Sequence, residues 1–193
     1  MSDALHIGLP PFLVQANSEP RVLATPEARM DYVLELVRAN IAADGGPFAA
    51  AVFEHDSGLL IAAGTNRVVS GYCSAAHAEI LALSLAQAKL NTHDLSADGL
   101  PACELVTSAE PCVMCFGAVI WSGVRSLICA AHSEDVEAIG FDEGPRPENW
   151  MSELEARGIT VTTGLLRDTA RTLLREYNTR NGVIYNARCG IYK

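Results

Sequence analysis

Strand-length apolar runs alternate with segments of helical periodicity along most of this 193-residue chain. Residues 48–54 and 59–66 are two such runs on either side of a His-Asp-Ser-Gly turn, which predicts an antiparallel hairpin. Three more runs follow, at residues 105–108, 125–131 and 159–163. A helical crossover before the last run makes that strand parallel to its predecessor. The pattern predicts an α/β fold, a three-layer α/β/α sandwich with a five-stranded mixed sheet.

Helix signals separate and flank these strands. Thr25 and Pro26 suit the cap and the first turn of a long helix. Ser74 is expected to cap the next helix, with His77 and Glu79 in its first turn. Three later helices are expected at residues 112–121, 149–157 and 168–180.

The length and the 49% apolar content fit a single domain over residues 1–193 with a sizeable core. Within it we expect residues 1–46 to form an N-terminal extension and the first helix. Residues 140–149, with their glycines and prolines, are the longest irregular stretch. Residues 181–193 form a C-terminal tail after the last helix.

Acidic side chains outnumber basic ones, 23 against 14, which gives a net charge of −9. Proteins that track phosphates usually carry the opposite charge, so a nucleic-acid partner is disfavoured. Arg167, Arg171 and Arg175 nevertheless make a basic stripe, either solvated or facing another subunit, or in contact with RNA. No apolar run reaches the roughly 20 residues of a spanning helix, and residues 1–14 lack a basic leader. We therefore expect a cytoplasmic protein with no membrane partner.

Three residues with metal-ligand chemistry stand near the starts of two expected helices: His77, Cys112 and Cys115. Two thiolates and an imidazole suit Zn²⁺ and leave the fourth tetrahedral position to water, as in catalytic sites. A bare Cys-x-x-Cys is a weak signal that a redox dithiol or half a zinc ribbon also explains. Glu79 is the discriminating residue, because two positions after His77 it lies near the metal without binding it and can move protons.

The combination of His77-Ala78-Glu79 with the Pro111-Cys112 to Cys115 segment resembles the signature of the zinc-dependent nucleobase deaminases, which have the cytidine-deaminase fold. The resemblance covers roughly residues 47–165. Within that superfamily the chain is most similar to bacterial guanine deaminases, through the motifs Gly46-Pro47-Phe48, Asn66 and Gly140-Phe141-Asp142-Glu143. Those enzymes usually carry two aspartates after the Gly-Phe pair, so Glu143 departs from their pattern.

The resemblance implies hydrolytic deamination of free guanine to xanthine and ammonia, with water as co-substrate and one zinc ion per chain. Glu79 and Glu143 would be catalytic. Asn66, Phe48, Glu143 and the main chain of Ala78 would bind the substrate, with Glu143 accepting the donors of the guanine edge. The residues themselves also allow a strand-end turn at Asn66, a core position for Phe48 and a solvated charge at Glu143.

The same resemblance implies a homodimer, with C-terminal tails that are sometimes exchanged between subunits. The tail from residue 181 onward would close over the site, with Tyr185 and Tyr192 as lid aromatics. Trp121, which closes the helix after Cys115, is expected in the core or at an interface.

Other functions remain open at this point. A tRNA adenosine deaminase is favoured by the segment 110–115 and the basic last helix, but the net charge argues against it. Cytosine and other aminated heterocycles would use the same catalytic residues. A non-catalytic zinc-binding interaction domain is the alternative of another class, and it lacks a suitably spaced fourth Cys or His ligand.

Overall fold

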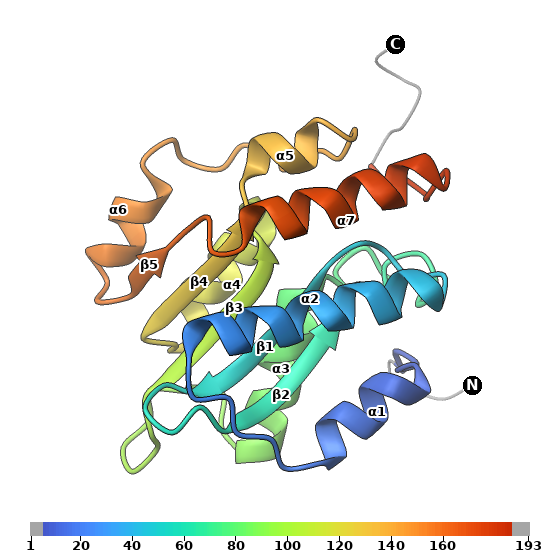
Figure 1. The fold of residues 1–193 in the computed structure, drawn as a ribbon. Helices are drawn as coiled ribbons and strands as arrows, with labels where there is room; N and C mark the ends of the chain where they lie inside the picture. The colour runs from blue at the N-terminus through green and yellow to red at the C-terminus, as the bar shows by residue number, and fades with distance from the viewer. Residues whose placement is uncertain (1–5, 187–193) are drawn as a thin grey trace.

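A mixed five-stranded sheet lies at the centre of the computed structural model, which describes residues 6–186 (Figure 1). The strand order is β2-β1-β3-β4-β5. The strands are β1 (Ala49–Glu54), β2 (Leu60–Thr65), β3 (Cys103–Ala109), β4 (Ser126–Ala131) and β5 (Thr160–Thr162). Strand β1 is antiparallel to β2 and β3, whereas β4 runs parallel to β3 and β5 runs parallel to β4. The predicted hairpin and the parallel last strand are confirmed.

Strand β1 shows why the sheet separates two cores. Successive side chains point to opposite faces of a strand. Ala51 and Phe53 therefore belong to one hydrophobic cluster, and Ala50 and Val52 belong to the other. Because both faces are buried, the strand is apolar at its first five positions in succession rather than at every second one.

Helices cover both faces of the sheet, which confirms the predicted three-layer sandwich. The helices are α1 (Pro11–Ser18), α2 (Pro26–Ala42), α3 (Ala78–Leu90), α4 (Val113–Ser122), α5 (Ser133–Glu137), α6 (Trp150–Glu155) and α7 (Arg167–Thr179). Helices α2 and α7 lie on one side of the sheet and α3 and α4 lie on the other (Figure 1). Along residues 6–186, no helix combines the length and apolar character needed to cross a membrane.

Helix α1 was not expected from the sequence. It is short, and its clearest sequence signal is Pro11 in the first turn. Asn17 docks it onto the edge strand β2, where its side-chain amide donates to the Ala63 carbonyl at 3.0 Å and accepts from the Ala63 N–H at 2.7 Å. This contact occupies backbone groups that an exposed sheet edge would leave unpaired.

The starts of α3 and α4 place the metal-type residues. The prediction that Ser74 caps α3 is wrong, because a tight turn, in which the His77 N–H donates to the Ala75 carbonyl at 2.8 Å, delays the helix. His77 is itself the N-cap residue of α3, and Cys112 is the N-cap residue of α4. Both have extended backbone, so each side chain leaves its helix at the end rather than along its flank. The predicted cap of α2 is confirmed, since Thr25 Oγ1 accepts from the Ala28 N–H at 3.2 Å.

Candidate active site

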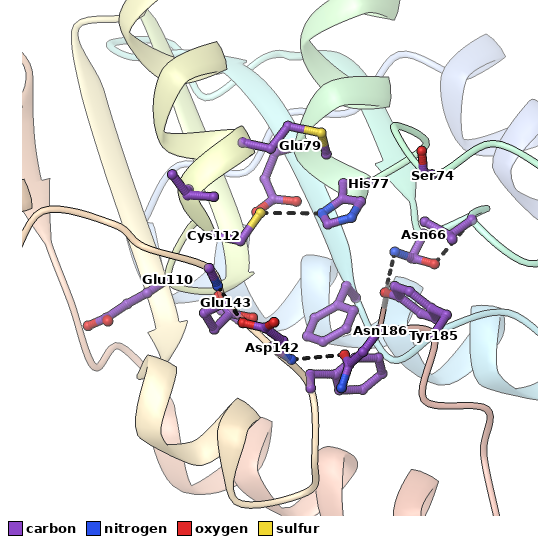
Figure 2. A pocket seen from close by; sticks show the side chains of 17 residues that line it. Asn66, Ser74, His77, Glu79, Glu110, Cys112, Asp142, Glu143, Tyr185 and Asn186 are labelled. Carbon is purple, nitrogen blue, oxygen red and sulfur yellow. Dashed lines mark hydrogen bonds between the residues drawn. The ribbon is translucent and has the colours of Figure 1, made fainter. Parts of the chain in front are cut away.

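A cavity of about 300 Å³ opens where the starts of α3 and α4 meet the loop of residues 140–149 (Figure 2). Polar and titratable side chains from distant parts of the sequence converge on it. They include Asn66, His77, Glu79, Cys112, Glu143 and Tyr185. Such a concentration of titratable groups in one cleft is typical of an active site.

His77, Cys112 and Cys115 lie in a geometry suited to zinc. The Nδ1 atom of His77 lies 3.5 Å from Cys112 Sγ and 3.6 Å from Cys115 Sγ. A tetrahedral ion with Zn–S bonds of about 2.3 Å and Zn–N bonds of about 2.0–2.1 Å holds its nitrogen and sulfur ligands about 3.6 Å apart. Among residues 6–186 this ligand group has three members. Three ligands leave a fourth position open, as in catalytic zinc sites.

The two thiols differ in their affinity for a proton. The hydrogen bond from Cys115, together with the His77 imidazole, lowers the pKa of Cys112 to about 4. The same hydrogen bond, together with burial, raises the pKa of Cys115 well above its usual value. One thiolate is therefore present at neutral pH, and a bound cation would replace the proton on the second sulfur. The donor set fits a zinc ion.

Glu79 lies in the first turn of α3, beside the ligand cluster (Figure 2). Its side chain is buried, with only 7% of its surface exposed. Burial raises the pKa of Glu79, and the negative charge of Cys112 raises it further. A carboxyl group whose pKa is raised toward neutrality is suited to accept and return protons.

Asn66 and two aromatic residues form the opposite wall. Asn66 follows β2, is 1% exposed, and accepts from the Val68 N–H at 3.3 Å through Oδ1. A Cβ atom at Gly46 would lie 2.7 Å from Asn66 Oδ1, so only glycine leaves room for this side chain. Phe48 packs edge-on against Phe141, with ring centroids 5.1 Å apart. This wall offers an amide and flat apolar surface to a planar ligand.

Glu143 enters the cavity from the loop of residues 140–149. Burial, reinforced by the charge of Cys112, raises its pKa to about 8. The Glu143 carbonyl accepts from the Val113 N–H at 3.0 Å. Gly144 has φ +70°, and a Cβ atom there would lie 2.6 Å from Val113 Cγ1. The loop is therefore pressed directly against the start of α4.

Two residues at or near the cavity lie outside those singled out from sequence: Asn186, which lines it, and Arg146 on the adjoining loop. Asn186 accepts from the Asp142 N–H at 2.9 Å and donates to the Gly140 carbonyl at 2.7 Å, which ties the tail to the loop. Arg146 donates to the Pro111 carbonyl at 2.7 Å. No local pattern marks either residue, because the three contacts just described join positions 35 to 46 apart in sequence.

A family model for the zinc-binding region of cytidine and deoxycytidylate deaminases matches residues 24–131, more than half of the chain. The chain belongs to this deaminase family. The match includes His77, Glu79, Cys112 and Cys115. The expected superfamily and the expected cytidine-deaminase-like fold are confirmed.

Solved structures and curated relatives place the deaminase more narrowly. A guanine deaminase from Nitrosomonas europaea is 90% identical, with a TM-score of 0.92 over 93% of this chain and 98% of that chain. A guanine deaminase from Bacillus subtilis is 37% identical over 99 residues, 51% of this chain. The matched part spans only 59% of that relative's length. A probable cytosine deaminase from Schizosaccharomyces pombe is 30% identical over 135 residues, 68% of this chain and 78% of that protein.

The structure brings most of the predicted site residues of the deaminase together. His77, Glu79, Cys112, Asn66, Phe48 and Glu143 line the cavity. Cys115 completes the ligand cluster from the first turn of α4. The side chain of Ala78 does not line the cavity, because it packs into the core beneath α3. Its N–H belongs to the first turn of that helix, where main-chain donors have no partner within the helix.

The basic stripe of the deaminase is largely neutralised. Arg167 and Arg171 both pair with Asp135, at 2.7 Å and 3.1 Å, and Arg167 also contacts Glu134. These contacts hold α7 against α5, which the sequence did not indicate. An arginine already paired with a carboxylate contributes little to phosphate binding, so the RNA-contacting alternative loses its main support.

Proposed function

We propose that this chain catalyses the hydrolytic deamination of guanine to xanthine and ammonia. The observation that carries the proposal is the placement of Glu79 beside the His77–Cys112–Cys115 cluster, on a cavity that Asn66 and Glu143 also line. The 90% identical relative from Nitrosomonas europaea, a guanine deaminase, supports it. Structures of that relative hold 8-azaguanine or 2,6-diaminopurine.

In this proposal His77, Cys112 and Cys115 would hold one zinc ion, which would lower the pKa of a water molecule toward neutrality. Glu79 would accept a proton from the attacking water, because burial raises the proton affinity of its carboxylate. The same carboxyl group then gives the proton to the ring nitrogen of guanine and later assists the departure of ammonia. The N–H of Ala78, at the start of α3, is placed to orient the water.

Recognition of the base falls to Asn66 on the opposite wall and to Glu143 on the loop of residues 140–149. The amide of Asn66 offers a donor and an acceptor to the purine edge. Glu143 in its carboxylate form accepts the N1–H and 2-amino donors of guanine, and adenine lacks this pair of neighbouring donors. Phe48 and Phe141 enclose the planar ring. Variants N66A, N66Q and E143D of the Nitrosomonas relative were solved with 8-azaguanine, and this chain has Asn66 and Glu143 at the same numbers.

A panel of substrates tests the proposal. Zinc-loaded protein is incubated with guanine, adenine, cytosine and tRNA, and released ammonia is measured. We expect the turnover of guanine to exceed that of the other substrates at least about tenfold, since a substrate that lacks a donor leaves a polar group of the site without its hydrogen-bond partner. Zinc-replete protein that releases no ammonia from guanine would refute the substrate, and a salt-dependent gel shift with tRNA would favour the adenosine alternative.

We also propose that residues 1–193 act as one deaminase domain whose tail, residues 181–193, covers the site. Tyr185 supports this, because it lines the cavity and packs against Phe141 with centroids 4.9 Å apart. Tyr192 lies outside the described residues. Removal of residues 183–193 is expected to raise the KM for guanine while leaving the melting temperature close to that of the full chain. Unchanged kinetics in the truncated protein would exclude a lid.

A cytoplasmic homodimer acting in purine metabolism completes the proposal, and exchanged tails are one form it can take. Trp121 supports the dimer, because it is 83% exposed rather than in the core. It borders a shallow hollow between α3 and α4. Light scattering on the purified protein should give twice the chain mass, and the W121A variant should shift toward the monomer. A monomeric wild type would exclude the dimer.

A further inference from the structure

We propose that Arg146 is a positioning residue that holds the loop carrying Glu143 in register with the metal-binding segment. This inference rests on the proposed function, since Glu143 is its target. Arg146 donates through Nη1 to the carbonyl of Pro111 at 2.7 Å. Pro111 immediately precedes Cys112, and Arg146 follows Glu143 by three residues. One side chain thus joins the two segments that must cooperate on the substrate.

The second nitrogen of the guanidinium has two partners of its own. Arg146 Nη2 lies 2.8 Å from Ser133 Oγ and 3.1 Å from Glu110 Oε2. Ser133 Oγ also donates to the same Glu110 oxygen at 3.1 Å. Three acceptors on two segments, Glu110-Pro111 and Ser133, require a planar fork, and an ammonium group cannot reach all of them from one point.

The arginine is shielded as well as bonded. Its side chain is 12% exposed, and its guanidinium carbon lies 4.3 Å from the centroid of the Trp150 ring. Hydrogen bonds to a charged group in such a shielded position are stronger than the same bonds in water. The Arg146 contacts are therefore a firm tether rather than a surface ion pair.

The loop needs such a tether because it has no helix or strand of its own. Residues 140–149 are irregular, and the hydrogen bond from the Val113 N–H to the Glu143 carbonyl links their backbone to the start of α4. Arg146 provides the side-chain link. The ligand segment, by contrast, is held by β3 and α4. Loss of Arg146 should therefore displace Glu143 and leave the metal site intact.

A double-mutant cycle tests whether Arg146 acts through Glu143. The variants are Arg146→Gln, Glu143→Gln and the double variant, with Arg157→Gln as a control for loss of an exposed pair. We expect R146Q to lower kcat/KM for guanine about 30- to 100-fold, as a displacement near 1 Å can do. In the E143Q background, R146Q should lower kcat/KM by less than about threefold, because the effects of two residues that act through one another do not add. Zinc content should stay at one ion per chain.

Arg146→Lys separates positioning from stability. Lysine keeps the ion pair with Glu110, so its melting temperature should return close to the wild-type value while kcat/KM stays about tenfold low. The inference is overturned if R146Q lowers activity equally in the wild-type and E143Q backgrounds, or does not lower it at all. It is also overturned if R146Q loses zinc, or if R146K recovers activity together with stability. If R146Q does not fold, Ser133→Ala takes its place in the cycle, with an expected threefold to fivefold loss that vanishes in E143Q. A wild-type protein inactive on guanine would refute the proposed function instead.

Discussion

The amide of Asn66 donates a hydrogen bond of 2.6 Å to the hydroxyl of Tyr185, across 119 positions of sequence (Figure 2). The tail thus holds the Asn66 amide in place through one N–H and leaves the second N–H for the purine edge. Burial raises the pKa of Tyr185 well above its ordinary value, so the hydroxyl stays neutral and keeps its own proton to donate.

Tyr185→Phe is expected to raise the KM for guanine about threefold to tenfold, because the hydrogen bond that orients the Asn66 amide, worth about 1 kcal/mol, is lost. The value of kcat should change less, since the proton path through Glu79 is untouched. Steady-state kinetics on both proteins give the answer. Tyr72→Phe, at a 97% exposed position, is the matched control and should behave as wild type. An unaltered KM in the Tyr185 variant would argue against contact between the tail and the substrate.

Glu79→Gln is expected to reduce turnover about 10²- to 10⁴-fold, because glutamine cannot move a proton but keeps the shape of the side chain. Zinc content, measured by elemental analysis, should stay at one ion per chain. A non-catalytic zinc-binding domain predicts instead that every measured property survives the change. Loss of zinc from the variant would mean that Glu79 is a ligand rather than a proton carrier.

Asp135→Asn is expected to destabilise the protein by about 1.5–3 kcal/mol near neutral pH, because hydrogen bonds to a charged group are lost. Burial alone would raise the pKa of Asp135, but hydrogen bonds from Arg167 and the His132 N–H lower it below the ordinary value of 3.8. A carboxyl group with a lowered pKa in the folded state stabilises the fold above its unfolded pKa. That stabilisation disappears as the pH falls through the folded value.

Urea unfolding of both proteins at several pH values checks this sign. The difference between wild type and D135N should be constant above about pH 5 and should shrink progressively below about pH 4. A difference that grows in acid would contradict the assignment.

Glu104→Gln is expected to lower the free energy of unfolding by about 3–5 kcal/mol, because Arg29 would remain buried without its counter-ion. The two side chains lie 2.7 Å apart and are 3% and 4% exposed. Glu153→Gln removes an exposed pair with Arg157 and should cost less than about 1 kcal/mol. Both sites are remote from the cavity, so kcat of the folded variants should match the wild type. An E104Q variant as stable as E153Q would show that the buried pair adds nothing.

Local spacing was enough to predict the chemistry of the site. His77, Glu79, Cys112 and Cys115 stand in two short motifs that resemble the deaminase signature, and a tetrahedral ion requires the side chains of its three ligands, His77, Cys112 and Cys115, to meet. The hairpin was predictable for the same reason, since its turn lies between two apolar runs. The start of α3 was not predictable, because Ser74 has a side chain typical of an N-cap residue. The turn at Ala75 shifts the first residue of the helix, so that Ser74 does not cap it.

Long-range contacts mark the limit of such reasoning. Helix α1 is only eight residues long, and it is held by a side chain that pairs with a strand 46 positions away. Arg146 finds its acceptors on segments that become neighbours only after the sheet has formed. The spacing of residues along the chain does not indicate these long-range contacts, although they help to shape the cavity and its surroundings.

His77 and Cys112 each stand at the start of a helix, so the metal site is held rigidly by α3 and α4, which pack against the sheet. The residues assigned to base recognition stand instead on a strand end, an irregular loop and the tail. The residues assigned to base recognition can therefore be substituted without disturbing the metal site. A scaffold divided in this way can change the base it accepts while its hydrolytic apparatus stays the same.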